Sequence, residues 1–93
     1  MYYTYLAKSL KNEKIYVGYS AKSPIERIKE HNSGSNKWSK QNGPFALIYY
    51  ETYYCDKDAR QREKFYKSGF GRQIRDIIIE YIENKSSGCG SVG

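Results

Sequence analysis

The chain has 93 residues, enough for one domain and little more, and its hydrophobic content of 39% indicates a globular protein rather than a disordered one. Sixteen Lys and Arg against ten Asp and Glu leave a net charge of +6, which favours a polyanionic partner such as nucleic acid. No apolar run approaches the ~20 residues of a membrane-spanning helix, and the N-terminus lacks a signal-peptide pattern. Because Cys55 and Cys89 form no CxxC pair, we expect two free thiols in a cytoplasmic protein without membrane association.

The first twenty residues predict a β-hairpin. Residues 2–7 are β-branched and aromatic, a polar connection follows, and residues 14–20 read as a second strand. On that strand Ile15, Val17 and Tyr19 should share one face, and Tyr16, Gly18 and Ser20 the other.

A helix and a long polar loop come next. Ser23 and Pro24 favour a helix start, and the helix should end near Asn32 with Ile25 and Ile28 toward the core. Residues 32–44 are expected to form a polar loop, and a loop of that length is more often functional than accidental.

The second half predicts one strand and two helices. Residues 45–54 form a strong strand, and Asp56 can cap a helix over residues 57–68 that stops at Gly69. The last helix, from Arg72 to about residue 84, has the clearest amphipathic pattern, with apolar side chains at Ile74, Ile77, Ile78, Tyr81 and Ile82. The expected fold is therefore α+β, a three-stranded, mainly antiparallel sheet flanked by three helices in the order β-β-α-β-α-α. It should occupy residues 1–85, and the small residues 86–93 should form a flexible tail.

Two residues on the first helix suggest phosphate chemistry. Arg27 and His31 lie four apart and share a helix face, so the guanidinium could bind a phosphate and the imidazole could move a proton. The alternative is a solvated face on which these groups pair with Glu26 and Glu30.

Glu63 is a candidate metal ligand. It lies along the stripe of Ala59 and Tyr66 that should face the sheet, and a Mg²⁺ held by one carboxylate, waters and phosphate oxygens is chemically normal. The alternative is an ion pair with Arg60 or Lys67.

Tyrosines on the hairpin could line a groove. Tyr3 and Tyr5 share one face of the first strand, and Tyr16 lies beside Gly18, which would leave space for a phosphate near the backbone. Ordinary packing is the alternative for each ring.

Two basic segments resemble nucleic-acid contacts. Lys37, Trp38 and Lys40 combine ammonium groups with an indole on which a base could stack, although the indole could instead anchor the loop. The segment from Arg60 to Arg75 holds six basic residues and the single acid Glu63, and we expect Arg60, Lys64 and Arg72 to contact nucleic acid.

Four separated motifs together resemble the GIY-YIG nuclease superfamily, in particular its small stand-alone bacterial branch. The motifs are "YYTYLAKS", "KIYVGYS" with "PIERIKEHNSG", "FALIYYE" and "DARQREKFYKSGFGR", and they span residues 2 to about 82. Tyr3 stands where the first signature has glycine, and Val17 where the second has isoleucine.

The resemblance implies roles for five residues. The two signature tyrosines would be Tyr5 and Tyr16, one of which helps to deprotonate the attacking water. Arg27 would stabilise phosphate charge, His31 would match the histidine of the family's helix, and Glu63 would hold Mg²⁺, with Mn²⁺ as a substitute.

The leading functional hypothesis is a metal-dependent endonuclease that cleaves DNA with low sequence specificity, on single-stranded or branched DNA in repair or recombination. The alternative is a non-catalytic nucleic-acid-binding module, and a third, weaker hypothesis is an adaptor for a repair or replication protein. A monomer is expected.

Overall fold

The structure is a computed structural model that describes residues 1–33 and 37–92, with residues 38, 39 and 85–92 described by their backbone alone. The order is β-β-α-α-β-α-α, which confirms the α+β class and adds one short helix to the predicted order. The elements are β1 (Tyr2–Ser9), β2 (Ile15–Ser20), α1 (Pro24–Asn32), α2 (Lys37–Asn42), β3 (Phe45–Tyr53), α3 (Asp56–Lys67) and α4 (Gly69–Val92).

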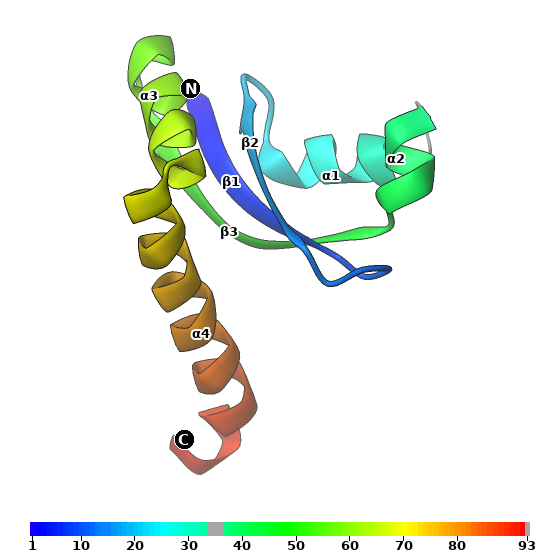
Figure 1. Ribbon diagram of the computed structural model, residues 1–93, viewed down its shortest axis with the longest axis vertical. Helices are drawn as coiled ribbons and strands as arrows, with labels where there is room; N and C mark the ends of the chain where they lie inside the picture. The colour runs from blue at the N-terminus through cyan, green and yellow to red at the C-terminus, as the bar shows by residue number, and fades with distance from the viewer. Residues whose placement is uncertain (34–36, 93) are drawn as a thin grey trace.

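The sheet has the strand order β2-β1-β3, and both pairings are antiparallel. β1 is therefore the central strand, and Figure 1 shows it between the other two. Tyr5 pairs with Gly18 on β2 and with Tyr50 on β3. The register against β3 shifts between Leu6 and Ala7, where β3 carries one extra residue.

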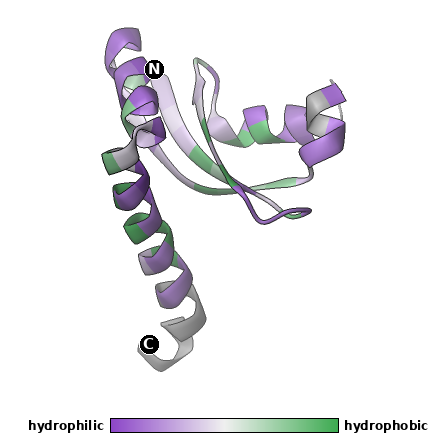
Figure 2. Cartoon of the chain, in the orientation of Figure 1, coloured by the Kyte–Doolittle hydropathy of each residue, from purple (hydrophilic) through white to green (hydrophobic). Residues whose placement is uncertain are grey.

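Helices cover both faces of the sheet, with α1 on one side and α3 and α4 on the other (Figure 1). The side chains of β1 alternate between these faces, so Tyr5 and Ala7 pack toward Ile28 of α1, whereas Leu6 packs toward Tyr66 of α3. Green segments of the sheet and of α4 in Figure 2 mark this apolar material, and α3 is largely purple.

The buried face of α1 differs from the prediction at one position. Pro24 and Ile28, four residues apart, are buried, whereas Ile25 is 54% exposed. Residues four apart lie above one another on a helix, and Ile25 is rotated away from that line. The prediction of Ile25 as a core residue was therefore wrong.

The predicted loop over residues 32–44 contains the helix α2. The sequence of α2 lacks the apolar periodicity that would have predicted a helix. The segment is closed by Asn32, whose side chain donates to the Phe45 carbonyl at 3.0 Å and accepts from the Phe45 N–H at 2.7 Å. Ser9 Oγ donates to the Asn42 carbonyl at 2.5 Å, which ties the end of α2 to β1.

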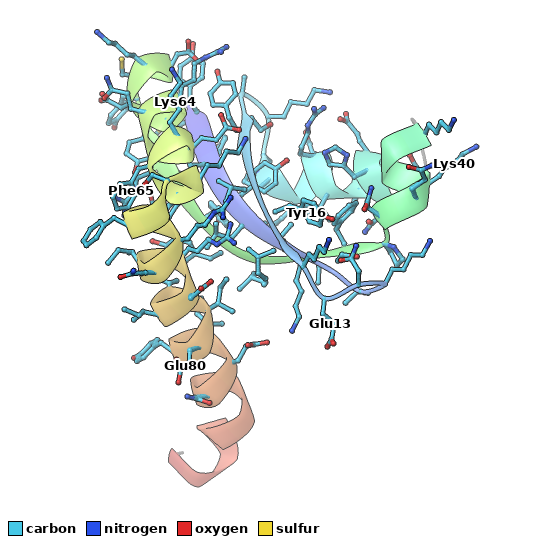
Figure 3. The ribbon with its side chains drawn as sticks, viewed as in Figure 1. Glu13, Tyr16, Lys40, Lys64, Phe65 and Glu80 are labelled. Atoms are coloured by element: carbon cyan, nitrogen blue, oxygen red, sulfur yellow. The ribbon has the colours of Figure 1, made fainter. Side chains whose placement is uncertain are left out.

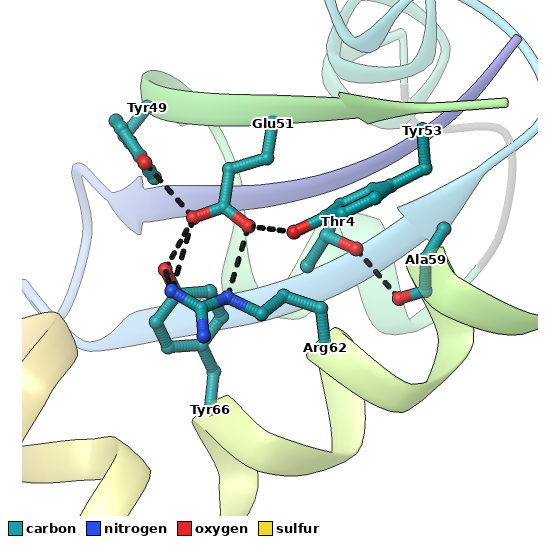
Figure 4. A network of polar contacts seen from close by, with 7 residues as sticks. All are labelled: Thr4, Tyr49, Glu51, Tyr53, Ala59, Arg62 and Tyr66. Carbon is teal, nitrogen blue, oxygen red and sulfur yellow. Dashed lines mark hydrogen bonds and ion pairs between the residues drawn. The ribbon is translucent and has the colours of Figure 1, made fainter.

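Glu51 on β3 is the centre of a polar network that attaches α3 to the sheet (Figure 4). Its carboxylate accepts hydrogen bonds from Tyr49, Tyr53 and Tyr66 at 2.8, 2.5 and 2.5 Å, and from Arg62 Nε at 3.0 Å. Burial alone would raise the pKa of Glu51, but these hydrogen bonds hold it below its ordinary value. Burial and the bond to Glu51 raise the pKa of Tyr53 to about 12, so this phenol keeps its proton.

The start of α3 and its junction with α4 also differ from prediction. Asp56 lies inside α3 and makes no cap; it pairs with Arg60 at 3.0 Å and accepts a hydrogen bond from Tyr19. Gly69 begins α4 instead of ending α3. Ser68, in extended conformation, separates the helices, and its Oγ accepts a hydrogen bond from the Gly71 N–H at 3.1 Å.

The buried face of α4 is rotated from the predicted one. Ile77 and Tyr81 are exposed, whereas Ile79 is buried and Ile74 and Ile78 pack beside it. Three consecutive isoleucines allow two apolar faces, and the contact of α4 with α3 selects one of them. α4 is assigned through Val92; the flexibility expected of residues 86–93 stays a prediction.

The structure contains no helix among its described residues that could cross a membrane. Cys55 is exposed and unpaired, as predicted, and the side chain of Cys89 lies outside the described residues.

We expect Gly71→Ala to destabilise the protein by about 1–3 kcal/mol, a typical cost of overpacking. A Cβ at Gly71 would lie 1.6 Å from the Phe65 carbonyl oxygen, which belongs to the backbone and cannot move aside. The matched control is Gly69→Ala in the same turn, where a Cβ meets no atom within 4 Å. Urea denaturation should show a loss for Gly71→Ala only; equal midpoints for the two variants would contradict this packing.

Candidate nuclease site

A hollow of about 480 Å³ lies between the helices that flank the sheet. Its lining residues come from β1, β2, α1, β3, α3 and α4. The polar or ionisable side chains that line it are Tyr5, Tyr16, His31, Lys67, Arg72 and Arg75. Three of these six were predicted site residues, and a fourth, Arg72, was a predicted nucleic-acid contact.

Tyr5 is buried and its ring lies directly over Gly18 on the neighbouring strand. A Cβ at Gly18 would be 2.3 Å from the Tyr5 ring. The sequence predicted that Gly18 leaves space for a phosphate, and this was wrong because the Tyr5 ring fills that space. The glycine therefore fixes the position of the phenol at the pocket wall.

Arg27 and Glu63 act electrostatically on the Tyr5 hydroxyl. Burial raises the pKa of Tyr5; the charge of Arg27 and its hydrogen bond to the phenol oppose this rise, and the charge of Glu63 adds to it. A guanidinium from α1 and a carboxylate from α3 thus act on one phenol of β1. Three residues distant in sequence therefore interact at one phenol, and their catalytic roles stay predictions.

Arg27 also has the partner that its alternative interpretation named. Its guanidinium pairs with Glu30 Oε1 at 3.2 Å, and Glu30 receives a second cation, Lys22, at 2.6 Å. The Arg27 side chain is 42% exposed, so its charge remains accessible to an anion. Glu26 is exposed on the same helix.

His31 lies at the pocket edge, one turn after Arg27. Its ring packs edge to face against Phe45, with 5.9 Å between ring centroids. Burial lowers the pKa of His31 from its ordinary 6.5, the charge of Arg27 lowers it further, and Glu30 partly opposes both. The imidazole is therefore neutral at pH 7 and able to accept a proton.

Tyr16 on β2 also lines the pocket. Its ring packs edge to face on Phe45 at 5.5 Å, and its hydroxyl donates to Asn42 Oδ1 at 3.2 Å. Asn12 donates to the same hydroxyl at 3.4 Å. These contacts anchor Tyr16 to α2 and to the β1–β2 connection.

Glu63 is the candidate metal ligand, and its side chain is 24% exposed. It pairs with Lys67 Nζ at 3.3 Å, which is one of the two ion pairs that its alternative interpretation named. Among the described residues, no cluster of three His, Cys, Asp or Glu could hold a metal by itself. A single carboxylate beside a pocket does fit Mg²⁺, which keeps waters and binds substrate phosphate oxygens.

The predicted nucleic-acid contacts lie on several elements. Lys37 and Lys40 are exposed on α2, and Lys64 is exposed on α3; Figure 3 shows Lys64 and Lys40 on opposite sides of the view, left and right, with Tyr16 between them. Arg60 lies over the Tyr19 ring at 4.5 Å, outside the residues that line the pocket. The side chain of Trp38 is outside the described residues.

The sequence analysis did not predict Lys67 and Arg75 as parts of the pocket. The sequence spacing could have indicated Arg75, because it lies four residues after Gly71 and four before the buried Ile79, on the same helix face. A charged residue within a buried helix stripe requires a specific reason. Lys67 had been considered only as an ion-pair partner of Glu63.

Comparisons with known proteins agree with the motifs. The family profile described as "GIY-YIG catalytic domain" matches residues 1–77. A UPF0213 protein of Clostridium perfringens is 32% identical over 87 residues, covering 92% of this chain and 87% of the relative. A UPF0213 protein of Pediococcus acidilactici, named for the ldhD 5′ region, is 30% identical over 76 residues, covering 78% and 72%. No solved structure matches the chain.

We expect Gly18→Ala to destabilise the protein by about 1–3 kcal/mol, because the new methyl group meets the Tyr5 ring. Most of this loss should disappear when Tyr5 is already Leu, because the aromatic ring is then absent. A double-mutant cycle by urea denaturation measures this coupling. Additive effects of the two substitutions would show that Gly18 and Tyr5 are not in contact.

Proposed function

The chain belongs to the GIY-YIG family, and from that premise we propose that it is a metal-dependent endonuclease that hydrolyses DNA phosphodiester bonds. The observation that supports this proposal is that the charges of Arg27 and Glu63 both act on the buried Tyr5 phenol, which lines the pocket, although Arg27 and Glu63 are not among the lining residues. A cation, a carboxylate and a proton-bearing hydroxyl are the groups that phosphodiester hydrolysis requires.

Arg27 supplies the charge for the phosphate. A guanidinium presents two parallel donors to phosphate oxygens, and its charge stabilises the negative charge that develops in the transition state. Its pairing with Glu30 on the exposed side of α1 orients the side chain before substrate arrives. The Tyr5 hydroxyl, protonated at neutral pH, donates a hydrogen bond to a phosphate oxygen or to the attacking water.

We assign the proton acceptor to His31 rather than to a tyrosine. A buried phenol with a raised pKa holds too little phenolate at pH 7 to be an efficient base. The imidazole of His31 has a lowered pKa and is neutral at the same pH. The family resemblance implies Tyr5 or Tyr16 as the base, and we propose His31 in their place.

Glu63 is the residue that would hold Mg²⁺ or Mn²⁺, and the bound ion would stabilise negative charge on the oxygens of the phosphodiester. Lys67 balances the Glu63 charge in the protein alone. Single-stranded or branched DNA is the substrate we propose, within repair or recombination.

The test is cleavage of labelled single-stranded, duplex and branched DNA with Mg²⁺, Mn²⁺ or EDTA. We expect cutting with the metals only, and a loss of about 100-fold or more in Glu63→Gln and in Arg27→Gln, the scale of one transition-state contact. Glu80→Gln, an exposed carboxylate on α4 (Figure 3), is the matched control and should cleave as the wild type does. Circular dichroism confirms that each variant is folded. Full activity in Glu63→Gln, or cutting in EDTA, would contradict the proposal.

The second candidate is a non-catalytic nucleic-acid-binding module, favoured by the ion pair that already occupies Glu63. This module would bind each DNA in the same assay without cleaving it, and binding would persist in Glu63→Gln.

The pH profile of cleavage identifies the base. If His31 accepts the proton, log kcat/KM in Mg²⁺ rises with a slope of about 1 at acidic pH and levels off above the His31 pKa, which lies below 6.5. If Tyr5 were the base, the rise would continue through pH 9, because the Tyr5 pKa lies above 10.0. His31→Ala should remove the acidic limb; a profile that keeps rising to pH 9 would overturn the assignment.

A further inference from the structure

Arg75 on α4 is a largely buried cation, and one of its donors is buried without a hydrogen-bond partner among the described residues. Its side chain is 18% exposed, and the unpartnered donor is Nε. The nearest carboxylate oxygen, Asp76 Oδ1, is 3.6 Å from Nε, which is too long for a hydrogen bond.

A buried donor without a partner costs free energy, so its presence needs a reason. Arg75 lies on the buried stripe of α4, between Gly71 and Ile79, where an apolar side chain would satisfy packing. Asp76 is exposed, so its carboxylate does not lie beside Arg75 in the interior. The side chain instead lines the pocket that holds Tyr5 and His31.

Two further cations line the same pocket. Lys67 at the end of α3 and Arg72 near the start of α4 stand with Arg75 as one basic wall, and the predicted catalytic groups Tyr5, Tyr16 and His31 line the pocket with them. Glu63 offsets part of this charge through its pair with Lys67, and Asp76 offsets part of it at 3.6 Å from Arg75 Nε, whereas Arg72 has no ion pair among the described residues. The wall is therefore positively charged and accessible from the hollow.

We propose that Arg75 binds a phosphate group of the nucleic-acid backbone in this pocket, with Arg72 and Lys67 as flanking cations. The inference rests on the proposed function for the identity of the anion. The guanidinium fork matches phosphate oxygens, and a bound anion would compensate for a buried positive charge that Asp76 approaches only to 3.6 Å. Arg27 and Arg75, on opposite helical layers, then contact the same strand of nucleic acid from two sides.

The experiment measures binding without cleavage. Labelled single-stranded and duplex oligonucleotides are titrated in EDTA over a series of KCl concentrations, with wild type, Arg75→Gln, Arg75→Lys and Arg75→Met. Lys57→Gln removes the same unit charge from an exposed position of α3 and is the matched control. Each variant is compared at a temperature where circular dichroism shows it folded.

We expect Arg75→Gln and Arg75→Met to bind about tenfold more weakly at low salt, the loss of one charge-assisted contact. For both variants, the slope of log Kd against log [KCl] should decrease by about one, which corresponds to the loss of one phosphate contact. Arg75→Lys should keep the slope while losing affinity, because it keeps the charge without the fork. Lys57→Gln should bind as the wild type does.

Thermal unfolding separates a binding role from a structural one. Arg75→Met removes an unpartnered buried donor and keeps a long side chain, so its Tm should equal or exceed that of the wild type. A lowered Tm with an unchanged salt slope would make Arg75 a structural residue and overturn the inference.

The two proposals fail in different ways. A protein that binds with an Arg75-dependent slope but never cleaves with Mg²⁺ or Mn²⁺ loses the nuclease assignment and keeps the phosphate site. A protein that cleaves while Arg75→Gln retains the wild-type slope and affinity loses the phosphate site alone.

Discussion

The carboxylate of Glu51 on β3 determines how α3 packs against the sheet. Three tyrosine hydroxyls and the Arg62 guanidinium converge on it, and two of these partners, Arg62 and Tyr66, belong to α3. Such a network is stable only when every polar group in it has a hydrogen-bond partner. It therefore favours one position of α3 on the sheet over other positions. Thr4 adds a hydrogen bond to the Ala59 carbonyl at 2.6 Å on the same side. α3 carries Glu63, and α4 packs closely against α3 at Gly71. The positions of the basic residues on these two helices therefore depend on the contacts of Glu51 with α3.

The strands could be predicted from the sequence because their side chains alternate strongly, and the helices from local signals such as Ser23 and Pro24. Where prediction failed, the deciding contacts were tertiary. Ile77 and Ile79 are equally apolar, and Ile79 is the buried one because it packs with Leu6 and Tyr66 on the far side of the sheet from α1. The helix α2 has no apolar stripe, so its formation depends on the anchoring of Asn42 and Asn32 at the ends of its segment. A local pattern contains neither kind of information.

For the candidate site, the family motifs predicted Tyr5, Arg27, His31 and Glu63. In the structure the charges of Arg27 and Glu63 act on Tyr5, and the charge of Arg27 acts on His31. The role of Gly18 was misjudged, because cross-strand pairing with Tyr5 is a matter of register rather than of residue type. Arg75 was missed for a related reason. A cation on a helix is ordinary, and it becomes informative only when its face is known to be buried and its donor to lack a partner.

The strand order has a consequence for the biosynthesis of this protein. β1 begins at Tyr2, yet it pairs with β3 and faces α3, so its side chains reach their final neighbours only after β3 and α3 have been synthesised. Arg75, in the last helix, arrives later still. A nascent chain that ends before α3 therefore has Tyr5 but neither Glu63 nor the basic wall. The order of the elements along the chain therefore delays the assembly of the pocket until α4 has been synthesised.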